Sequence, residues 1–446
     1  MEGERTRPVS ACLMALSLFV TCLALVPTRN ALAGSSGSIQ ALPDSNGIRV
    51  VAREIELYFN KTNGGEITEY FDLVVDPSRS RNLANIRWKP WENLLPLFTS
   101  LFYKPPNVTL VLSTGGDPSA KLSLIGNTSE YAIIQSSSRI MDKSGQILKD
   151  VNGNAVYVNS TWIIRDTGLI SVQRAFLAPN PTALSPGWRW YPFYLTRTAT
   201  SAYSFTFHMF NTTYTNSAIV NPTIYKDAFN MFQPIPNDTR HVFGVALPFS
   251  NASVGGDGTH NILIAYKYDE MINADQWKSD NYYSTRNNIT EAGAVYEFSQ
   301  PTSMSVHTYH LLVNFTHQAV DGEVLQSFAD YYAQNPSIAL PMECSTASNK
   351  DLYKPGDYYA FYVSGISHYR LTRLIGRLTV TSSSDKIMYK QQYGPANTAA
   401  GQTFNLTLLT GVVAPLPDTY TVLFEILSQS GIVVSSSSKM IVVATP

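Results

Sequence analysis

The sequence is poor in cysteine. Only three Cys occur among 446 residues, and two of them, Cys12 and Cys22, lie in an N-terminal apolar segment. Without that segment Cys344 has no partner in the chain, which excludes an intramolecular disulfide framework. Cys344 can be a buried thiol, an intermolecular bridge or a reactive group. A chain of this length can build its cores without disulfides.

Charge is also scarce. Asp, Glu, Lys and Arg make up 15% of the chain and its formal net charge is -1, whereas ordinary globular proteins contain about 25% charged residues. Nothing in this composition attracts nucleic acid or anionic lipid by charge, so we expect no nucleic-acid partner. The polar surface must come from Ser, Thr, Asn, Gln and the 26 Tyr.

Sequence motifs of hydrolases are missing. The chain has no Gly-x-Ser-x-Gly nucleophile elbow and no His-Glu-x-x-His zinc helix. The triplet Asp166-Thr167-Gly168 occurs once, but aspartic proteases need two carboxylates that share a proton. We therefore interpret the triplet as a turn between strands, and no catalytic constellation supports a hydrolase.

Apolar runs of membrane-spanning length are confined to the N-terminus. Arg5 and Arg7 precede an apolar run at residues 9–26, and Ala31-Leu32-Ala33 before Gly34 fits a small-residue cleavage site. Residues 1–33 are therefore predicted to be a signal peptide, with an uncleaved N-terminal anchor as the alternative. Both indicate export to the outer face of the cell membrane or to the cell surface.

Glycosylation signals are frequent in the remaining chain. Each Asn-x-Ser/Thr sequon predicts a surface position, because a glycan cannot be buried in a packed core. N-linked glycans are thus expected partners of an exported chain. The ten sequons are at Asn60, Asn107, Asn127, Asn159, Asn211, Asn237, Asn251, Asn288, Asn314 and Asn405.

Patterns typical of β-strands dominate residues 34–334. Runs rich in Val, Ile, Tyr and Thr are bounded by Gly, Pro, Asn and Asp. Helical spacing is limited to Trp91 to Tyr103 and Gly322 to Gln334. These patterns predict a mostly β domain with few helices. The expected strands are Ile48 to Phe59, Val108 to Ser113, Glu130 to Gln135, Ile163 to Phe176, Tyr203 to Phe210, Val242 to Phe249, His260 to Tyr268 and Tyr309 to Phe315.

A second domain is predicted at residues 353–446. Residues 335–352 lose periodicity and carry two prolines and a Ser/Thr/Asn cluster, which is typical of a linker. Six or seven short strands then follow, with turns every eight to twelve residues, which favours an immunoglobulin-like β-sandwich. The last two strands are joined by Ser428-Gln429-Ser430-Gly431, which predicts a closing hairpin.

Two side chains could serve as ligands of a haem iron. His260 follows a Gly-rich connection, and strand parity places it on the same face as Ile262 and Ile264. Met141 lies on a loop directly after a predicted strand. Met and His are a recognised axial pair for haem iron, and a haem without a Cys-x-x-Cys-His motif is non-covalent haem b. Nearby competitors as ligands are His208, Met209 and His241.

The order of the segments in residues 48–318 resembles the DOMON-like haem-binding β-sandwich. The segments that carry the resemblance are Val108 to Leu112, Glu130 to Gln135 followed by Met141, Trp162 to Ile164, and Val242 to Phe249 leading to His260. Among such proteins, the exported, sequon-rich and cysteine-poor chain is similar to archaeal glycosylated b-type cytochromes. The resemblance implies one haem b held by Met141 and His260, with a membrane-bound respiratory subunit or another redox protein as partner.

Two functions remain as expectations. One is an extracytoplasmic b-type haem protein that transfers single electrons in or beside a respiratory chain and is not itself a catalyst. The alternative is a cell-surface structural or adhesive glycoprotein, in a surface layer or bound to glycans, that has no cofactor. In that case Met141 and His260 are ordinary residues.

Overall fold

The structure is a computed structural model that describes residues 38–444 with internal gaps. The gaps are 75–76, 81, 83, 85, 89–92, 96–98, 105–106, 142–143, 151, 178–188, 199–203, 210–211, 218–242, 249–260, 269–275, 285–288, 298–305, 317–330, 332–334, 336–337, 339, 385 and 413–415. Only the backbone is described for Asp72 and for the strands within residues 86–113 and 176–316. No helix among the described residues is long and apolar enough to cross a membrane.

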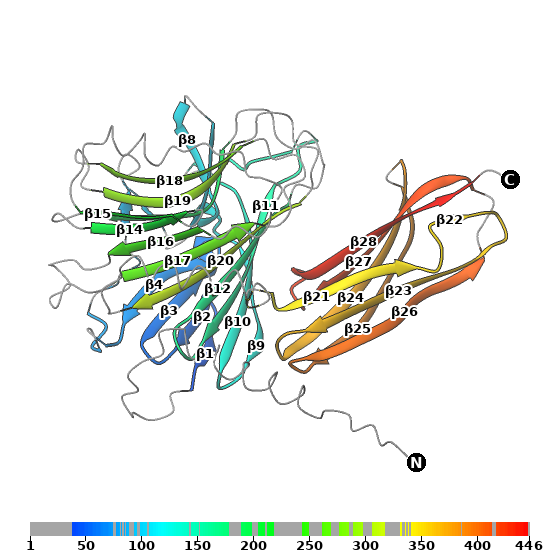
Figure 1. Cartoon of the computed structure of the whole chain (residues 1–446), viewed down its shortest axis with the longest axis horizontal. Helices are drawn as coiled ribbons and strands as arrows, with labels where there is room; N and C mark the ends of the chain where they lie inside the picture. Colours follow the sequence, from blue (N-terminus) through cyan, green and yellow to red (C-terminus); the bar gives the residue numbers. More distant parts are fainter. Residues whose placement is uncertain are drawn as a thin grey trace, which may run out of the picture.

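The described chain is mostly β and folds into β-sandwiches, as predicted (Figure 1). The expected strands of the first domain are all present, and two of them are hairpins. Ile48 to Phe59 covers most of β2 (Gly47–Val51) and β3 (Ile55–Asn60). Ile163 to Phe176 covers the end of β11 (Tyr157–Arg165) and most of β12 (Ile170–Leu177). The Asp166-Thr167-Gly168 triplet is the turn between β11 and β12, with Gly168 at φ 85°.

The described residues of the first domain form four sheets. A four-stranded sheet has the order β1 (Gln40–Pro43), β2, β3, β4 (Glu66–Asp72). A nine-stranded sheet has the order β15 (Thr212–Ser217), β14 (Ser204–Met209), β16 (Phe243–Pro248), β17 (Asn261–Tyr268), β20 (Val306–Thr316), β12 (Ile170–Leu177), β11 (Tyr157–Arg165), β10 (Tyr131–Arg139), β9 (Lys121–Asn127). A five-stranded sheet has the order β18 (Gln276–Ser284), β19 (Ile289–Glu297), β13 (Arg189–Thr198), β7 (Thr99–Lys104), β8 (Asn107–Ser113), and β5 (Ile86–Trp88) pairs with β6 (Asn93–Leu95). Two short 3-10 helices, η3 (Lys61–Asn63) and η4 (Thr114–Gly116), join strands.

Strands β10 and β11 are buried on both faces, which explains their continuous apolar runs. On one face Trp162 packs edge-on against Phe59 of the four-stranded sheet, with 5.4 Å between ring centroids. On the other face Ile133 and Ile163 belong to one hydrophobic cluster with Tyr369 and Leu371 of the second domain. At β10 and β11, the nine-stranded sheet therefore lies between the four-stranded sheet and the second domain.

A buried ion pair lies inside the first domain. Arg174 Nη2 is 2.6 Å from Glu66 Oε2, and both side chains are at most 1% exposed. The Thr114 hydroxyl donates to the other carboxylate oxygen of Glu66 at 2.6 Å, and the guanidinium lies 5.1 Å from the ring centre of Trp162. Burial raises the pKa of Glu66, against the opposing attraction of Arg174. This cluster ties β4, η4 and β12 together.

The second domain is an immunoglobulin-like sandwich. Its three-stranded sheet has the order β21 (Met342–Ser348), β23 (Tyr358–Ser367), β26 (Gln402–Val412). Its five-stranded sheet has the order β22 (Leu352–Tyr353), β28 (Val433–Val443), β27 (Asp418–Leu427), β24 (Leu371–Ser382), β25 (Ile387–Thr398). Strands β27 and β28 form the predicted hairpin, with Gly431 at φ 79° in its turn.

Two predictions about local structure were wrong. The segment Trp91 to Tyr103, predicted to be helical, contains β6 and most of β7, because Pro96 prevents a continuous helix and β7 pairs with β8 and β13. The predicted linker 335–352 contains β21, whose Ser- and Thr-rich sequence suits an edge strand that is half exposed. The other predicted helix, Gly322 to Gln334, lies outside the described residues apart from Tyr331, whose backbone is helical.

The two domains are joined by specific contacts around Tyr369. The Tyr369 hydroxyl donates to the Ile338 carbonyl at 2.9 Å and accepts a hydrogen bond from the Arg165 guanidinium. The Tyr369 ring packs edge-on against Tyr131, with 4.9 Å between centroids. The Tyr131 hydroxyl in turn accepts from the Arg370 backbone N–H at 2.6 Å. Tyr369 thus anchors the second domain to β10 and β11.

Candidate functional site: an apolar seam in the second domain

The two sheets of the second domain are open along one side, between the edge strands β25 and β26. Strand β25 ends the five-stranded sheet and β26 ends the three-stranded sheet, and each pairs with a neighbour on one side only. Both strands run along the same lower border of this domain in Figure 1. We call the groove between them, which exposes the interior of the sandwich, the seam.

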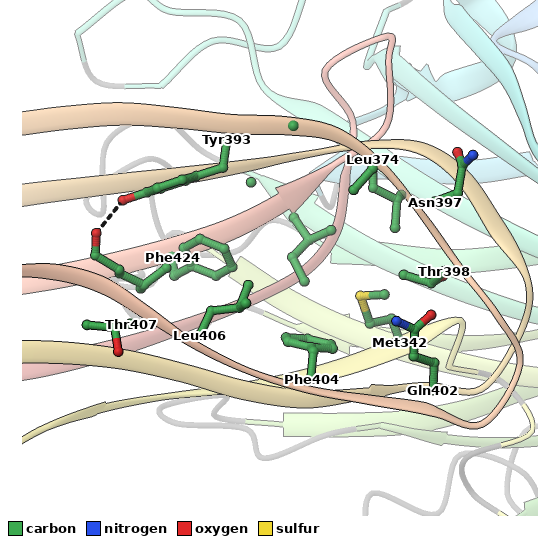
Figure 2. Close-up of a pocket in the computed structure, with 15 residues that line it drawn as sticks. Met342, Leu374, Tyr393, Asn397, Thr398, Gln402, Phe404, Leu406, Thr407 and Phe424 are labelled. Carbon is green, nitrogen blue, oxygen red and sulfur yellow. Dashed lines mark hydrogen bonds between the residues drawn. The ribbon is translucent and has the colours of Figure 1, made fainter.

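One end of the seam is an apolar cavity of about 350 Å³ (Figure 2). Its walls include Phe404 and Leu406 of β26 and Phe424 of β27. Polar groups are grouped at one end, where Asn397, Thr398 and Gln402 lie close to the connection between β25 and β26.

A second cavity of about 270 Å³ follows along the same two strands. It is lined by residues from the beginning of β25 and the end of β26, among them Met388 and Val412. Near the middle, the Tyr393 hydroxyl of β25 donates to the Leu408 carbonyl of β26 at 2.6 Å. Burial raises the pKa of Tyr393.

Large apolar side chains of the seam are exposed to solvent. Such side chains occur singly on most surfaces, but a contiguous group marks an interaction site. Here the group lines the two consecutive cavities. Its members and their exposed fractions are Met388 41%, Leu406 53%, Val412 66% and Leu416 53%.

The sequence of the seam is poor in charged residues, a feature that the strand pattern did not reveal. Residues 387–417 include a single charged side chain, Lys390, in a chain segment of 31 residues. Exposed strands normally carry charges on their solvent side. A long segment with a single charge that forms exposed edges is therefore typical of an interaction surface.

The seam can bind apolar matter but has no groups for acid–base or nucleophilic chemistry. Among its lining residues, only tyrosine hydroxyls titrate. The cavities offer aromatic and aliphatic walls, and the two strand edges offer backbone donors and acceptors. This combination suits an extended polypeptide better than a small polar substrate.

The predicted haem ligands are not brought together by the described part of the fold. Met141 is 7% exposed and forms an isolated bridge with Ile147 just beyond the end of β10. His260 lies outside the described residues, and the next residue, Asn261, begins β17. The pairing registers place Asn261 at the end of the sheet where β10 begins. The nine residues of β10 span about 30 Å at about 3.3 Å per residue. This length of strand separates Met141, which follows the end of β10, from the end of the sheet where β17 begins.

The competing haem ligands add no described side-chain contact. His208 and Met209 lie in β14, for which the backbone alone is described, and His241 lies outside the described residues. No group of three His, Cys, Asp or Glu side chains that could hold a metal ion occurs among the described residues.

The sequons differ in accessibility. Asn127 at the end of β9 and Asn405 in β26 are exposed, and Asn60 is half exposed and caps η3. Asn159, near the beginning of β11, is only 9% exposed, so the folded chain does not present it as the sequon pattern predicted. Asn107 and Asn314 lie in β8 and β20, where the backbone alone is described. The remaining sequons, Asn211, Asn237, Asn251 and Asn288, lie outside the described residues.

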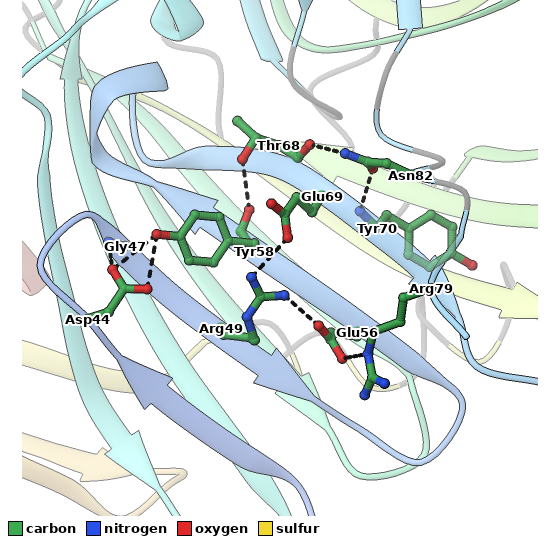
Figure 3. Close-up of polar contacts among 10 residues, drawn as sticks. All are labelled: Asp44, Gly47, Arg49, Glu56, Tyr58, Thr68, Glu69, Tyr70, Arg79 and Asn82. Carbon is green, nitrogen blue, oxygen red and sulfur yellow. Dashed lines mark hydrogen bonds and ion pairs between the residues drawn. The ribbon is translucent and has the colours of Figure 1, made fainter. Parts of the chain in front are cut away.

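A charged network covers the outer side of the four-stranded sheet (Figure 3). Glu56 is almost buried and lies 2.5 Å from both Arg49 and Arg79, and Arg49 also reaches Glu69 at 3.0 Å. Burial and hydrogen bonding to Asp44 raise the pKa of Tyr58 to about 12. Each carboxylate has a cationic or hydroxyl partner, so the network holds strands together.

The thiol of Cys344 is partly covered. Cys344 lies in β21, and its sulfur accepts a hydrogen bond from Ser435 at 3.3 Å. Burial raises the pKa of Cys344, which lowers its thiolate fraction and its reactivity at neutral pH. Of the three roles open at the sequence level, a packed thiol agrees best with these contacts.

Comparison with known proteins gives no family. No family model and no curated protein matches the chain. Among solved structures, a β-glucuronidase from Bacteroides uniformis is similar over 62% of this chain and 26% of its own length, with 7% identity and a TM-score of 0.21. A copper-containing benzylamine oxidase from Hansenula polymorpha is similar over 67% of this chain and 64% of its own, with 8% identity and a TM-score of 0.27. The chain thus spans about a quarter of the β-glucuronidase, and likenesses at this level carry no argument about function.

Proposed function

We propose that the chain is an exported cell-surface glycoprotein with a structural or adhesive role, and that its second domain is the attachment module. The observation that carries the proposal is the seam, where exposed apolar side chains lie between two strand edges that carry a single charged residue, Lys390. Such edges are sites of strand addition by other chains. The docked first domain supplies a rigid base through Tyr369.

The N-terminal apolar segment and the exposed sequons support export. Asn127 and Asn405 lie on different domains, and both side chains are exposed. On β26, the side chain of Asn405 alternates with those of Phe404 and Leu406, which line the seam. A glycan on Asn405 would therefore leave from the outer side of the sheet and keep the seam accessible.

Glycopeptide mapping tests the proposal. Native protein released from the surface of intact cells is expected to carry glycans on Asn127 and Asn405, because both side chains reach solvent. Asn159 provides the internal control and is expected to stay unmodified, since it is 9% exposed. Liquid chromatography with mass spectrometry of intact glycopeptides measures the occupancy. Unmodified Asn127 and Asn405 in protein recovered only from the cytosol would contradict the proposal.

Single-electron transfer through haem b, bound by Met141 and His260, is the competing proposal and rests on the resemblance alone. Under the glycoprotein proposal, the purified native chain is expected to show no Soret band and no reducible α bands. The measurement is an absorption spectrum of the oxidised and dithionite-reduced protein. A Soret band that is lost in His260→Ala and in Met141→Ala would reject the glycoprotein proposal in favour of a cytochrome.

A further inference from the structure

Three edge strands in the described part of the chain lack the features that usually keep strand edges from pairing. Natural edges are protected by charged side chains, by proline or by short length. Strands β8, β15 and β26 are six to eleven residues long and contain neither a charged residue nor a proline. Each ends its sheet and pairs with a neighbour on one side only.

Most other edge strands have at least one of these features. Strands β1, β5, β6 and β22 are two to four residues long. The longer edge strands β4, β18, β21 and β25 contain charged residues or proline. These residues are Glu66, Glu69 and Asp72 in β4, Lys278 and Asp280 in β18, Glu343 in β21, and Lys390 and Pro395 in β25. None of these short or charged edge strands contains a sequon.

The unprotected edge strands, in contrast, each carry a sequon. Asn107 is the first residue of β8, and Asn405 lies within β26. Asn211 directly precedes β15, and the other two positions of its sequon belong to that strand. The remaining edge strand, β9, begins with Lys121 and ends with the sequon residue Asn127, whose side chain is exposed. Sequons therefore occur on the edges where charge is absent or confined to one end.

A glycan can protect an edge in place of charge because it occupies the space that an added strand needs. An added strand lies about 4.8 Å from its neighbour, whereas an N-linked glycan is bulky and solubilising. On β26 the Tyr393 hydroxyl already bonds the Leu408 carbonyl, and Asn405 lies on the part of the strand before this bond. Its side chain alternates with those of Phe404 and Leu406, so the glycan leaves from the outer side and keeps the seam open.

We propose that N-linked glycans on Asn107, Asn127, Asn211 and Asn405 protect the strand edges of this chain from pairing with other chains, in the place of charged side chains. This inference rests on the proposed function, because it needs a glycosylated chain, and it assigns these four glycans a role. It also limits the partners of the second domain to those that enter through the seam.

Removal of one edge glycan tests the proposal. In the full glycosylated chain, Asn405→Gln is expected to raise the rate of aggregation at least about tenfold, because the β26 edge is then bare. Asn107→Gln, Asn127→Gln and Asn211→Gln, added to this variant, are expected to raise the rate further. Light scattering of concentrated protein measures the rate, and far-ultraviolet circular dichroism checks that each variant is folded.

Two further variants separate edge protection from the solubility that any glycan confers. Thr62→Ala removes the sequon of Asn60, which ends a strand paired on both sides. It keeps the hydrogen bond from the backbone N–H of residue 62 to Asn60 Oδ1, and it is expected to aggregate as slowly as the parent. Asn405→Lys returns a charge to the β26 edge without a glycan and is expected to restore the rate of the parent.

Two results overturn the proposal. One is an Asn405→Gln variant that aggregates no faster than the parent or than Thr62→Ala, and the other is an Asn405→Lys variant that aggregates as fast as Asn405→Gln. The glycopeptide map separates this failure from that of the proposed function. A glycosylated Asn405 whose removal changes nothing rejects the edge role alone, whereas unmodified Asn127 and Asn405 reject both proposals.

Discussion

Arg174→Met is expected to destabilise the first domain by about 3–5 kcal/mol at neutral pH. The change removes the guanidinium 2.6 Å from Glu66 and leaves a carboxylate that is 1% exposed without its counter-charge. Met retains a flexible apolar stem that can fill the space beside Trp162. Urea unfolding followed by tryptophan fluorescence measures the loss. All six Trp precede residue 335, so the signal reports the first domain.

The loss is expected to depend on pH. Burial raises the pKa of Glu66, and Arg174 opposes that rise, so removal of Arg174 raises the pKa further. A carboxyl whose pKa is higher in the folded state than in the unfolded state binds protons on folding. Its cost is therefore felt above the unfolded pKa of about 4.3 and disappears as the pH falls through the folded pKa. The deficit of Arg174→Met should be largest at neutral pH and shrink toward about pH 4.

Arg79→Met is the matched control in the same domain. Arg79 is 46% exposed, and its partner Glu56 keeps a second contact with Arg49 at 2.5 Å. Loss of one partly exposed arginine from this network is expected to cost less than about 1 kcal/mol. Two results would contradict this prediction. One is an equal loss in the free energy of unfolding for Arg174→Met and Arg79→Met, and the other is a loss for Arg174→Met that does not change with pH.

Tyr369→Ala is expected to uncouple the two domains. The change removes a ring that is 7% exposed, with its edge contact to Tyr131 and its hydrogen bonds to Ile338 and Arg165. Truncation of a buried aromatic side chain lowers the free energy of unfolding by about 3–5 kcal/mol. Because the Tyr369 side chain contacts both domains, we expect part of this loss to weaken the contact between them. In the parent, the tryptophan signal and the far-ultraviolet circular dichroism are expected to share one midpoint. In the variant, the two midpoints should separate.

Tyr358→Ala provides the control for this experiment. Tyr358 lies in β23 of the same domain and is 57% exposed, so its truncation should change stability by no more than about 0.5 kcal/mol. Coincident midpoints in both variants would mean that the contacts around Tyr369 do not couple the domains. Separate midpoints already in the parent would mean that the domains unfold independently.

Strand positions in the second domain could be predicted because they depend on local sequence. Turn glycines with positive φ mark the strand boundaries: Gly356 precedes β23, Gly401 lies between β25 and β26, and Gly431 lies between β27 and β28. Local patterns failed where apolar spacing was ambiguous over a short segment. Apolar residues in Trp91 to Tyr103 have helical spacing. This segment nevertheless contains strands, because Pro96 prevents a continuous helix and β7 pairs with β8 and β13.

Long-range pairing explains what the local patterns could not predict for the candidate site. Strands β25 and β26 are consecutive and joined by the short connection 399–401, which in most β proteins predicts a hairpin. In this structure β25 pairs with β24 and β26 pairs with β23, so the two consecutive strands belong to different sheets. A hairpin between them would have closed the seam, and its absence exposes Leu406 and Met388.

The sequence by itself determined that this chain is mostly β, because strand periodicity and turn residues are local properties. Its loss of periodicity at residues 335–352 and its cysteine count predict two domains without an intramolecular disulfide framework. Its sequons and N-terminal apolar segment likewise predict export without reference to the fold. Only the tertiary structure decided which edges stay unpaired, that Asn159 is buried, and that Met141 lies beyond the opposite end of the sheet from the beginning of β17. Strand order and register decide these points, because they join residues far apart in the chain through backbone hydrogen bonds that any strand sequence can form.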